Sequence, residues 1–222
     1  KWQVNAATGN HVDPYPSPSG PSTIRGRLQV LTSEFDPNQN PGALYFVEGQ
    51  YVTEDDAAAG NNFNNSSYRQ IIPNSAGTDF SLTGQTIQME SVLWAWQNYG
   101  DGTVKWIDQH LLGGHQVIDL GDGYYRYEYA IQSVTSDQSV GSVSIALPHG
   151  VSLRNIGFAD ADYHSGEPYT NTDWTTEHTG GFFTWKSTQT FADNQNANAS
   201  RWSTMFTFSF ESVGGWSTPN LA

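Results

Sequence analysis

The chain of 222 residues contains no cysteine, which excludes disulfides, thiolate catalysis and cysteine-based zinc or iron–sulfur sites. Positive charge is also scarce, since 9 Lys and Arg stand against 22 Asp and Glu and the formal net charge is -13. So few cations cannot form the basic patch that nucleic acid requires, and they disfavour anionic membranes. No apolar run approaches the roughly 20 residues of a membrane-spanning helix. We therefore expect no nucleic-acid partner and no membrane span.

Aromatic residues are abundant by contrast. They make up 14% of the chain, as do the charged residues, so most of the polarity comes from Asn, Ser, Thr, Gln and Gly. This combination is typical of extracellular β-sandwiches and differs from cytosolic helical enzymes. It predicts a secreted or cell-surface protein. The chain begins with Lys1, which we interpret as the start of a mature or trimmed fragment.

The clearest secondary-structure signal is the strict alternation of residues 124–131. Tyr125, Tyr127 and Tyr129 fall on one face of this run, whereas Arg126 and Glu128 fall on the other. A period of two predicts a half-buried strand. Runs at 142–147 and 151–159 predict two more strands, which we expect to form an antiparallel meander. About a dozen such runs separated by turn residues predict an all-β fold, an antiparallel β-sandwich of jelly-roll type.

The remaining organisation follows from local composition. Residues 1–23 are rich in Pro, Ser and Gly and predict an extended N-terminal arm, and residues 24–222 predict a single β-sandwich domain. Alternation at 24–31 and apolar character at 86–96 predict strands. One short helix is expected near residues 53–60, because Thr53 can cap it, acidic residues fill its first turn and Gly60 ends it.

The loop after residue 159 carries the densest set of potential ligands. Asp160, Asp162, His164 and Glu167 lie within eight positions, with Asp173 shortly after. Clustered carboxylates are hard oxygen ligands for Ca²⁺, and a histidine among them also suits a transition metal. The sequence thus predicts a metal site at these four residues, with Ca²⁺ preferred. The alternative is that the acidic groups only cap turns.

Other candidates are less organised. Exposed aromatic rings stack on sugars, which makes Trp106, Trp174 and Tyr163 candidate ligand-binding residues, although aromatic side chains equally form cores and interfaces. We expect Glu128 to pair with an arginine on a neighbouring strand. A tight turn predicted at residues 113–114 would bring His110 and His115 near each other, although ordinary surface or strand-end histidines are favoured. Asn64, Asn65 and Asn198 each begin an N-glycosylation sequon.

Four motifs are distinctive: residues 48–61, residues 64–69, residues 162–169 with 172–174, and residues 198–204. Together they resemble a group of uncharacterised secreted proteins from planctomycete-like and related environmental bacteria, and the resemblance extends from about residue 2 to residue 210. It implies an exported protein with a β-rich fold. Because the group has no assigned activity, the resemblance implies no catalytic residues.

These observations favour an extracellular structural or interaction protein that assembles with copies of itself through strand edges and the N-terminal arm. One alternative is a β-sandwich module that binds or cleaves polysaccharide. Another is a metal-dependent enzyme centred on residues 160–167. The chain contains no nucleophile elbow, phosphate-binding loop or dinucleotide fingerprint. The sequence therefore predicts no organic cofactor and favours a non-enzymatic role without deciding it.

Overall fold

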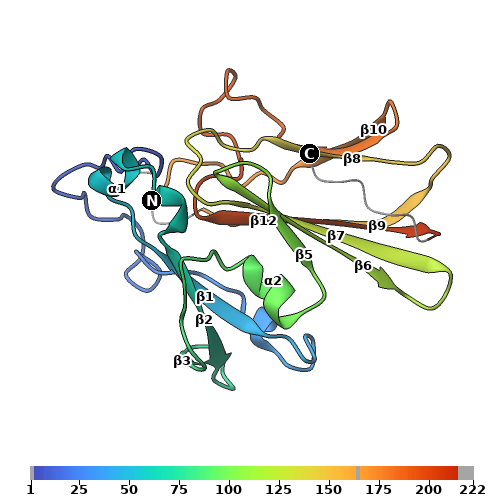
Figure 1. The fold of residues 1–222 in the computed structure, drawn as a ribbon, viewed down its shortest axis with the longest axis horizontal. Helices are drawn as coiled ribbons and strands as arrows, with labels where there is room; N and C mark the ends of the chain where they lie inside the picture. The colour runs from blue at the N-terminus through green and yellow to red at the C-terminus, as the bar shows by residue number, and fades with distance from the viewer. Residues whose placement is uncertain (1–2, 164–165, 215–222) are drawn as a thin grey trace. The chain divides into compact units, whose positions relative to one another are not determined.

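The computed structural model describes residues 3–163 and 166–214, and they divide into two compact units (Figure 1). Residues 3–95 form the bulk of the first, here called the N-terminal unit. Residues 96–163 and 167–214 form the second, here called the sandwich unit. The arm boundary predicted after residue 23 stays a prediction. None of the helices in the described part of the chain is long and apolar enough to cross a membrane.

The N-terminal unit contains one antiparallel sheet. Its strands are β1 (Tyr45–Gln50), β2 (Ser66–Pro73), β3 (Phe80–Leu82) and β4 (Ile87–Gln88). The order is β1-β2-β3, with β4 also pairing with β2. Three short helices accompany the sheet: η1 (Thr32–Phe35), α1 (Glu54–Ala58) and η2 (Asn62–Asn64).

The predicted short helix is confirmed as α1. Thr53 is extended at the N-cap, and the three acidic residues of the first turn face the positive end of the helix dipole. Gly60 adopts a φ of 73° just after the helix, a left-handed conformation that glycine adopts without strain.

Two predicted strands of the N-terminal unit are absent. Residues 22–26 form turns around Gly26, whose φ is 67°, and residues 28–31 belong to no strand. Within 86–96 only β4 is a strand, because Met89 turns the chain with a φ of 65°. Helix α2 (Trp94–Tyr99) follows.

The beginning of the predicted arm is folded onto its own unit. Val4 and His11 form an antiparallel bridge, and Asn62 donates to the carbonyls of Ala6 and Ala7 at 3.3 and 3.2 Å. Gly9 lies directly against Thr53, where a Cβ atom would come within 2.3 Å of the backbone. Residues 12–23 remain almost entirely exposed.

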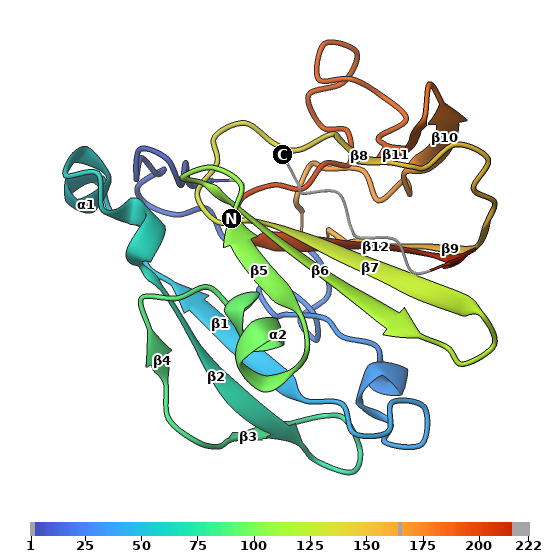
Figure 2. The same ribbon diagram turned by 45° about the vertical axis from the view of Figure 1, so that its right-hand side comes forward.

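The sandwich unit contains two antiparallel sheets, whose strands are labelled in Figure 2. The five-stranded sheet has the order β5-β6-β7-β12-β9, and the three-stranded sheet has the order β10-β11-β8. The strand bounds are β5 (Thr103–Trp106), β6 (Leu111–Asp119), β7 (Tyr124–Ser133), β8 (Ser142–Ala146), β9 (Leu153–Ala159), β10 (Thr175–Thr179), β11 (Phe182–Lys186) and β12 (Thr204–Val213).

The predicted meander is wrong, although its three strands exist. β7 and β9 belong to the five-stranded sheet and lie on either side of β12, whereas β8 belongs to the other sheet. The reason is burial: Val143 and Ile145 face the core from the sheet opposite Tyr129, so the chain crosses between the layers after β7 and returns after β8.

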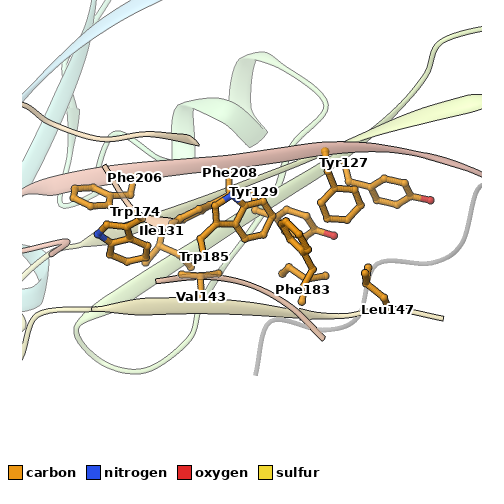
Figure 3. Close-up of a cluster of buried hydrophobic side chains, with 12 residues drawn as sticks. Tyr127, Tyr129, Ile131, Val143, Leu147, Trp174, Phe183, Trp185, Phe206 and Phe208 are labelled. Carbon is orange, nitrogen blue, oxygen red and sulfur yellow. The ribbon is translucent and has the colours of Figure 1, made fainter. Parts of the chain in front are cut away.

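The core lies between these two sheets and is mainly aromatic (Figure 3). Phe206, Phe208 and Phe210 of β12 alternate inward and are fully buried. Trp185 of β11 meets Phe208 with ring centroids 5.3 Å apart. Rings buried from both layers at such distances make a dry, specific core. The predicted all-β sandwich is thus confirmed, and its jelly-roll connectivity stays a prediction.

Candidate functional site

Most of the predicted site residues that the structure describes lie in the acidic loop of the sandwich unit, defined here as residues 160–163 and 167–173, which follows β9. Asn171 fixes this loop by accepting a hydrogen bond from the Tyr163 N–H at 2.8 Å and donating to its carbonyl at 2.9 Å. The Tyr163 hydroxyl donates to the Ala199 carbonyl at 2.8 Å. Tyr163 is 6% exposed, so its ring is an anchor of the loop.

A second segment, residues 194–201, interlocks with the acidic loop through Asn198. The Asn198 amide donates to the Asp160 carboxylate and, at 3.1 Å, to the Thr172 carbonyl. The Trp174 indole donates to the Asn198 carbonyl at 3.0 Å. Asn198 is only 2% exposed, so this predicted glycosylation sequon is closed to modification in the folded chain.

Trp174 joins this network to the core. Its ring stacks on Phe158 with centroids 5.6 Å apart and meets Phe206 at 5.4 Å. With 5% exposure it offers no free face to a sugar. Of the three predicted ligand-binding aromatics, only Trp106 on β5 is exposed, at 38%. The structure brings Tyr163 and Trp174 into one loop network and leaves Trp106 apart on β5.

The electrostatics of the loop centre on Asp160. Burial raises the pKa of this carboxyl above its usual value, the hydrogen bond from Asn198 opposes the shift, and the charges of Asp173 and Asp162 add to it. These three carboxylates are therefore close enough to repel one another. Glu167 acts instead on Tyr163 and Tyr169, whose hydroxyl pKa values rise chiefly through burial.

The arrangement does not by itself define a metal centre. Among residues 3–163 and 166–214 no group of three or more His, Asp or Glu side chains has the geometry to hold an ion. The predicted ligand His164 lies outside the described residues. The site at Asp160, Asp162, His164 and Glu167 therefore stays a prediction.

Arg201 braces the same region from the second segment. Its guanidinium lies 3.7 Å from the centroid of the Tyr169 ring and donates to the Ala197 carbonyl at 2.9 Å and to the Gln195 carbonyl at 3.1 Å. Sequence reasoning assigned no role to Arg201 and treated Asn198 only as a sequon. The signal available was the Asn-rich run before β12, because buried Asn side chains satisfy loop backbone groups.

The predicted turn at residues 113–114 is wrong, and with it the pairing of His110 and His115 that it would have allowed. Gly113 and Gly114 lie inside β6, between β5 and β7, and form no turn. His110 precedes the strand and its Nδ1 lies 2.9 Å from the Thr135 hydroxyl, whereas His115 is opposite Tyr129. Burial and the nearby Lys105 lower the pKa of His115.

A second polar cluster surrounds Glu211 at the far end of β12. Arg126 donates to one carboxylate oxygen at 3.1 Å, while Arg154 and Asn155 donate to the other at 3.0 and 2.8 Å. Burial raises the pKa of Glu211, but these hydrogen bonds outweigh it and the net shift is downward. Arg126 thus pairs with Glu211, and the ion pair expected for Glu128 is absent from those the described residues show.

The position of the Glu211 cluster explains its role. The pairing of β12 with β9 shifts register between Ser209 and Glu211, and Asn155 has a φ of 48° at the same place. The carboxylate therefore ties β7, β12 and β9 together across a β-bulge.

No protein-family model, curated protein or solved structure matches this chain.

Proposed function

We propose that this chain is an extracellular interaction protein that assembles with copies of itself through its N-terminal unit. The observation that carries the proposal is the imbalance of apolar burial between the two units. Among the described residues of 3–95, only five apolar residues are buried: Ala6, Tyr68, Ile71, Leu93 and Ala95. Twelve large ones are exposed: Val12, Tyr15, Leu28, Val30, Leu31, Leu44, Tyr51, Phe63, Ile72, Phe80, Leu82 and Met89.

The sandwich unit shows the opposite balance, since most of its large aromatic side chains are buried between two sheets. So many exposed apolar side chains beside so few buried ones favour a surface that binds a partner. Covering such side chains gains about 25 cal/mol for each Å² removed from water, which favours association. The extracellular location rests on the composition, with few charges and many Asn, Ser and Thr residues.

Light scattering coupled to size exclusion tests this proposal. We expect a mass above the 24.4 kDa of one chain, rising with protein concentration. A test variant replaces exposed residues of the N-terminal unit by serine: Leu28, Leu31, Tyr51 and Met89. A matched control does the same in the sandwich unit: Tyr99, Ile156, Phe182 and Phe191. Assembly should be lost only in the test variant, and a strictly monomeric native chain would contradict the proposal.

A second candidate function is polysaccharide binding on the outer face of the five-stranded sheet. Trp106 is 38% exposed there, and Gln116, Glu128 and Ser209 form a cross-strand row on the same face, two rows away from the row that Trp106 shares with Leu112. An exposed aromatic ring on a face that also carries hydrogen-bonding side chains supports sugar recognition. Titration with a panel of neutral and acidic glycans tests it, with Trp106→Ala expected to remove any binding.

A further inference from the structure

The three-stranded sheet of the sandwich unit leaves part of the opposite sheet's inner face uncovered. On β6, Val117 lies opposite the buried Tyr127, so the two side chains share the core face. Tyr127 is 0% exposed, whereas Val117 is 38% exposed. The core face of the five-stranded sheet therefore continues beyond the layer that covers it.

The edge next to this uncovered face belongs to β8. Trp174, just before β10, packs on β9 and β12 through Phe158 and Phe206, and Trp185 of β11 packs on Phe208 of β12. Since the three-stranded sheet runs β10-β11-β8 and the larger sheet runs β9-β12-β7-β6-β5, β8 is the strand on the β6 side. A strand added to the free edge of β8 would cover Val117.

β8 also lacks the devices by which proteins protect an open strand edge. Such edges are usually blunted by charge, proline, bulges or short length. The other described edge strands of four or more residues each carry a charge: Glu48 on β1, Lys105 on β5, Arg154 on β9 and Glu177 on β10. β8 is five residues long, uncharged and regular, and alternates exposed Ser with buried Val and Ile.

Residues 28–31 have the properties of the missing strand. They pair with no strand among the described residues, the backbone of Leu31 is extended, and Leu28 and Val30 are exposed at 85% and 53%. Their alternation is the pattern of a half-buried strand. The segment 24–31 contains two arginines and no acid, whereas residues 96–163 and 167–214 contain five Lys and Arg against thirteen Asp and Glu. The segment and the sandwich unit are thus complementary in charge.

We propose that residues 28–31 of one copy add as a fourth strand to the free edge of β8 in a second copy, with Leu28 and Val30 covering the exposed core face of β6. This inference rests on the proposed self-assembly and names its contact. Backbone hydrogen bonds to β8 provide the pairing, and the alternate apolar side chains provide the specificity.

The test exploits the lack of native cysteine. Gln29→Cys and Ser144→Cys are made in separate full-length chains, which are mixed and oxidised. Gln29 is exposed and would lie on the face opposite Leu28 and Val30 once the segment is a strand, and Ser144 is exposed on the outer face of β8, so neither change disturbs the core. Ser142→Cys samples the neighbouring register. Thr207→Cys, exposed on the outer face of β12, is the matched control.

We expect a mixed disulfide between Gln29→Cys and one of the two β8 variants, none with Thr207→Cys, and its loss when Val30→Asp is added. If light scattering shows assemblies but the β8 variants cross-link no better than the control, the inference fails while the proposed function stands. A chain that never assembles overturns both. A chain carrying both cysteines that closes an internal disulfide as a dilute monomer also overturns the inference.

Discussion

Tyr127 and Tyr129 allow the energetics of the aromatic core to be tested with a matched pair of substitutions. Both side chains are buried on the same face of β7. The Tyr127 hydroxyl donates to the Gly214 carbonyl at 2.9 Å, whereas the Tyr129 hydroxyl has no hydrogen-bond partner among the described residues. Burial raises the pKa of Tyr129 strongly, and the neighbouring Tyr127 adds to the shift.

Removing a buried, unpaired hydroxyl relieves a desolvation cost of roughly 1–3 kcal/mol, whereas removing a paired one loses about 1 kcal/mol. Tyr129→Phe should therefore raise the free energy of unfolding by about 1 kcal/mol, and Tyr127→Phe should lower it by about the same amount. In a chain of this size each change corresponds to roughly 2–4 °C in Tm.

Urea unfolding followed by tryptophan fluorescence measures both variants, since Trp185 and Trp174 lie in the same core. Equal m values in wild type and variants are the control that the unfolded state has not changed. If Tyr129→Phe destabilises the protein as much as Tyr127→Phe, then the Tyr129 hydroxyl is satisfied and the reasoning is refuted.

Three further predictions concern packing and pH. Gly102→Ala should cost about 2 kcal/mol, because a Cβ there would come within 2.6 Å of the Trp96 ring, and unchanged urea stability would contradict this close packing. Glu211→Gln should lower stability at neutral pH. That difference should vanish as pH falls through the lowered pKa of Glu211, which a series of unfolding curves checks. Asp160→Asn should raise stability at neutral pH, because a raised pKa penalises the charged form. The gain should shrink as the carboxyl protonates at low pH. Thermal melts of wild type and variant across pH measure this gain, and a gain that does not change with pH would contradict the reasoning.

The sequence predicted the sandwich because inward aromatics at every second position leave few alternatives. On β7 the predicted alternation is correct, because Tyr127 and Tyr129 share one face and are both buried. Alternation says which face is buried but not which strand is the neighbour. The meander therefore failed at β8, where the chain changes sheet, and the predicted strand at 24–31 is not paired in the structure.

The candidate site was located correctly as a loop, but its internal bonding was not foreseen. Asn198 lies 38 residues after Asp160, and a hydrogen bond over that separation leaves no local pattern. The same holds for Glu211, which accepts a hydrogen bond from Arg126, 85 residues earlier in the chain. Side chains that satisfy distant groups are invisible to periodicity, which reports only local geometry.

The polar groups of the acidic loop and its neighbours therefore mainly stabilise the loop itself. Tyr163, Trp174 and Asn198 each donate to backbone carbonyls within the sandwich unit, so they are not available to a ligand. In the described part of the chain, the groups that remain accessible to a partner include the strand edge of β8 and the exposed apolar side chains of Leu28 and Val30. Groups of this kind bind by strand addition and burial, which act between proteins and require no catalytic residue. For this reason we propose that the chain acts through its strand edges and exposed apolar side chains and not through the acidic loop.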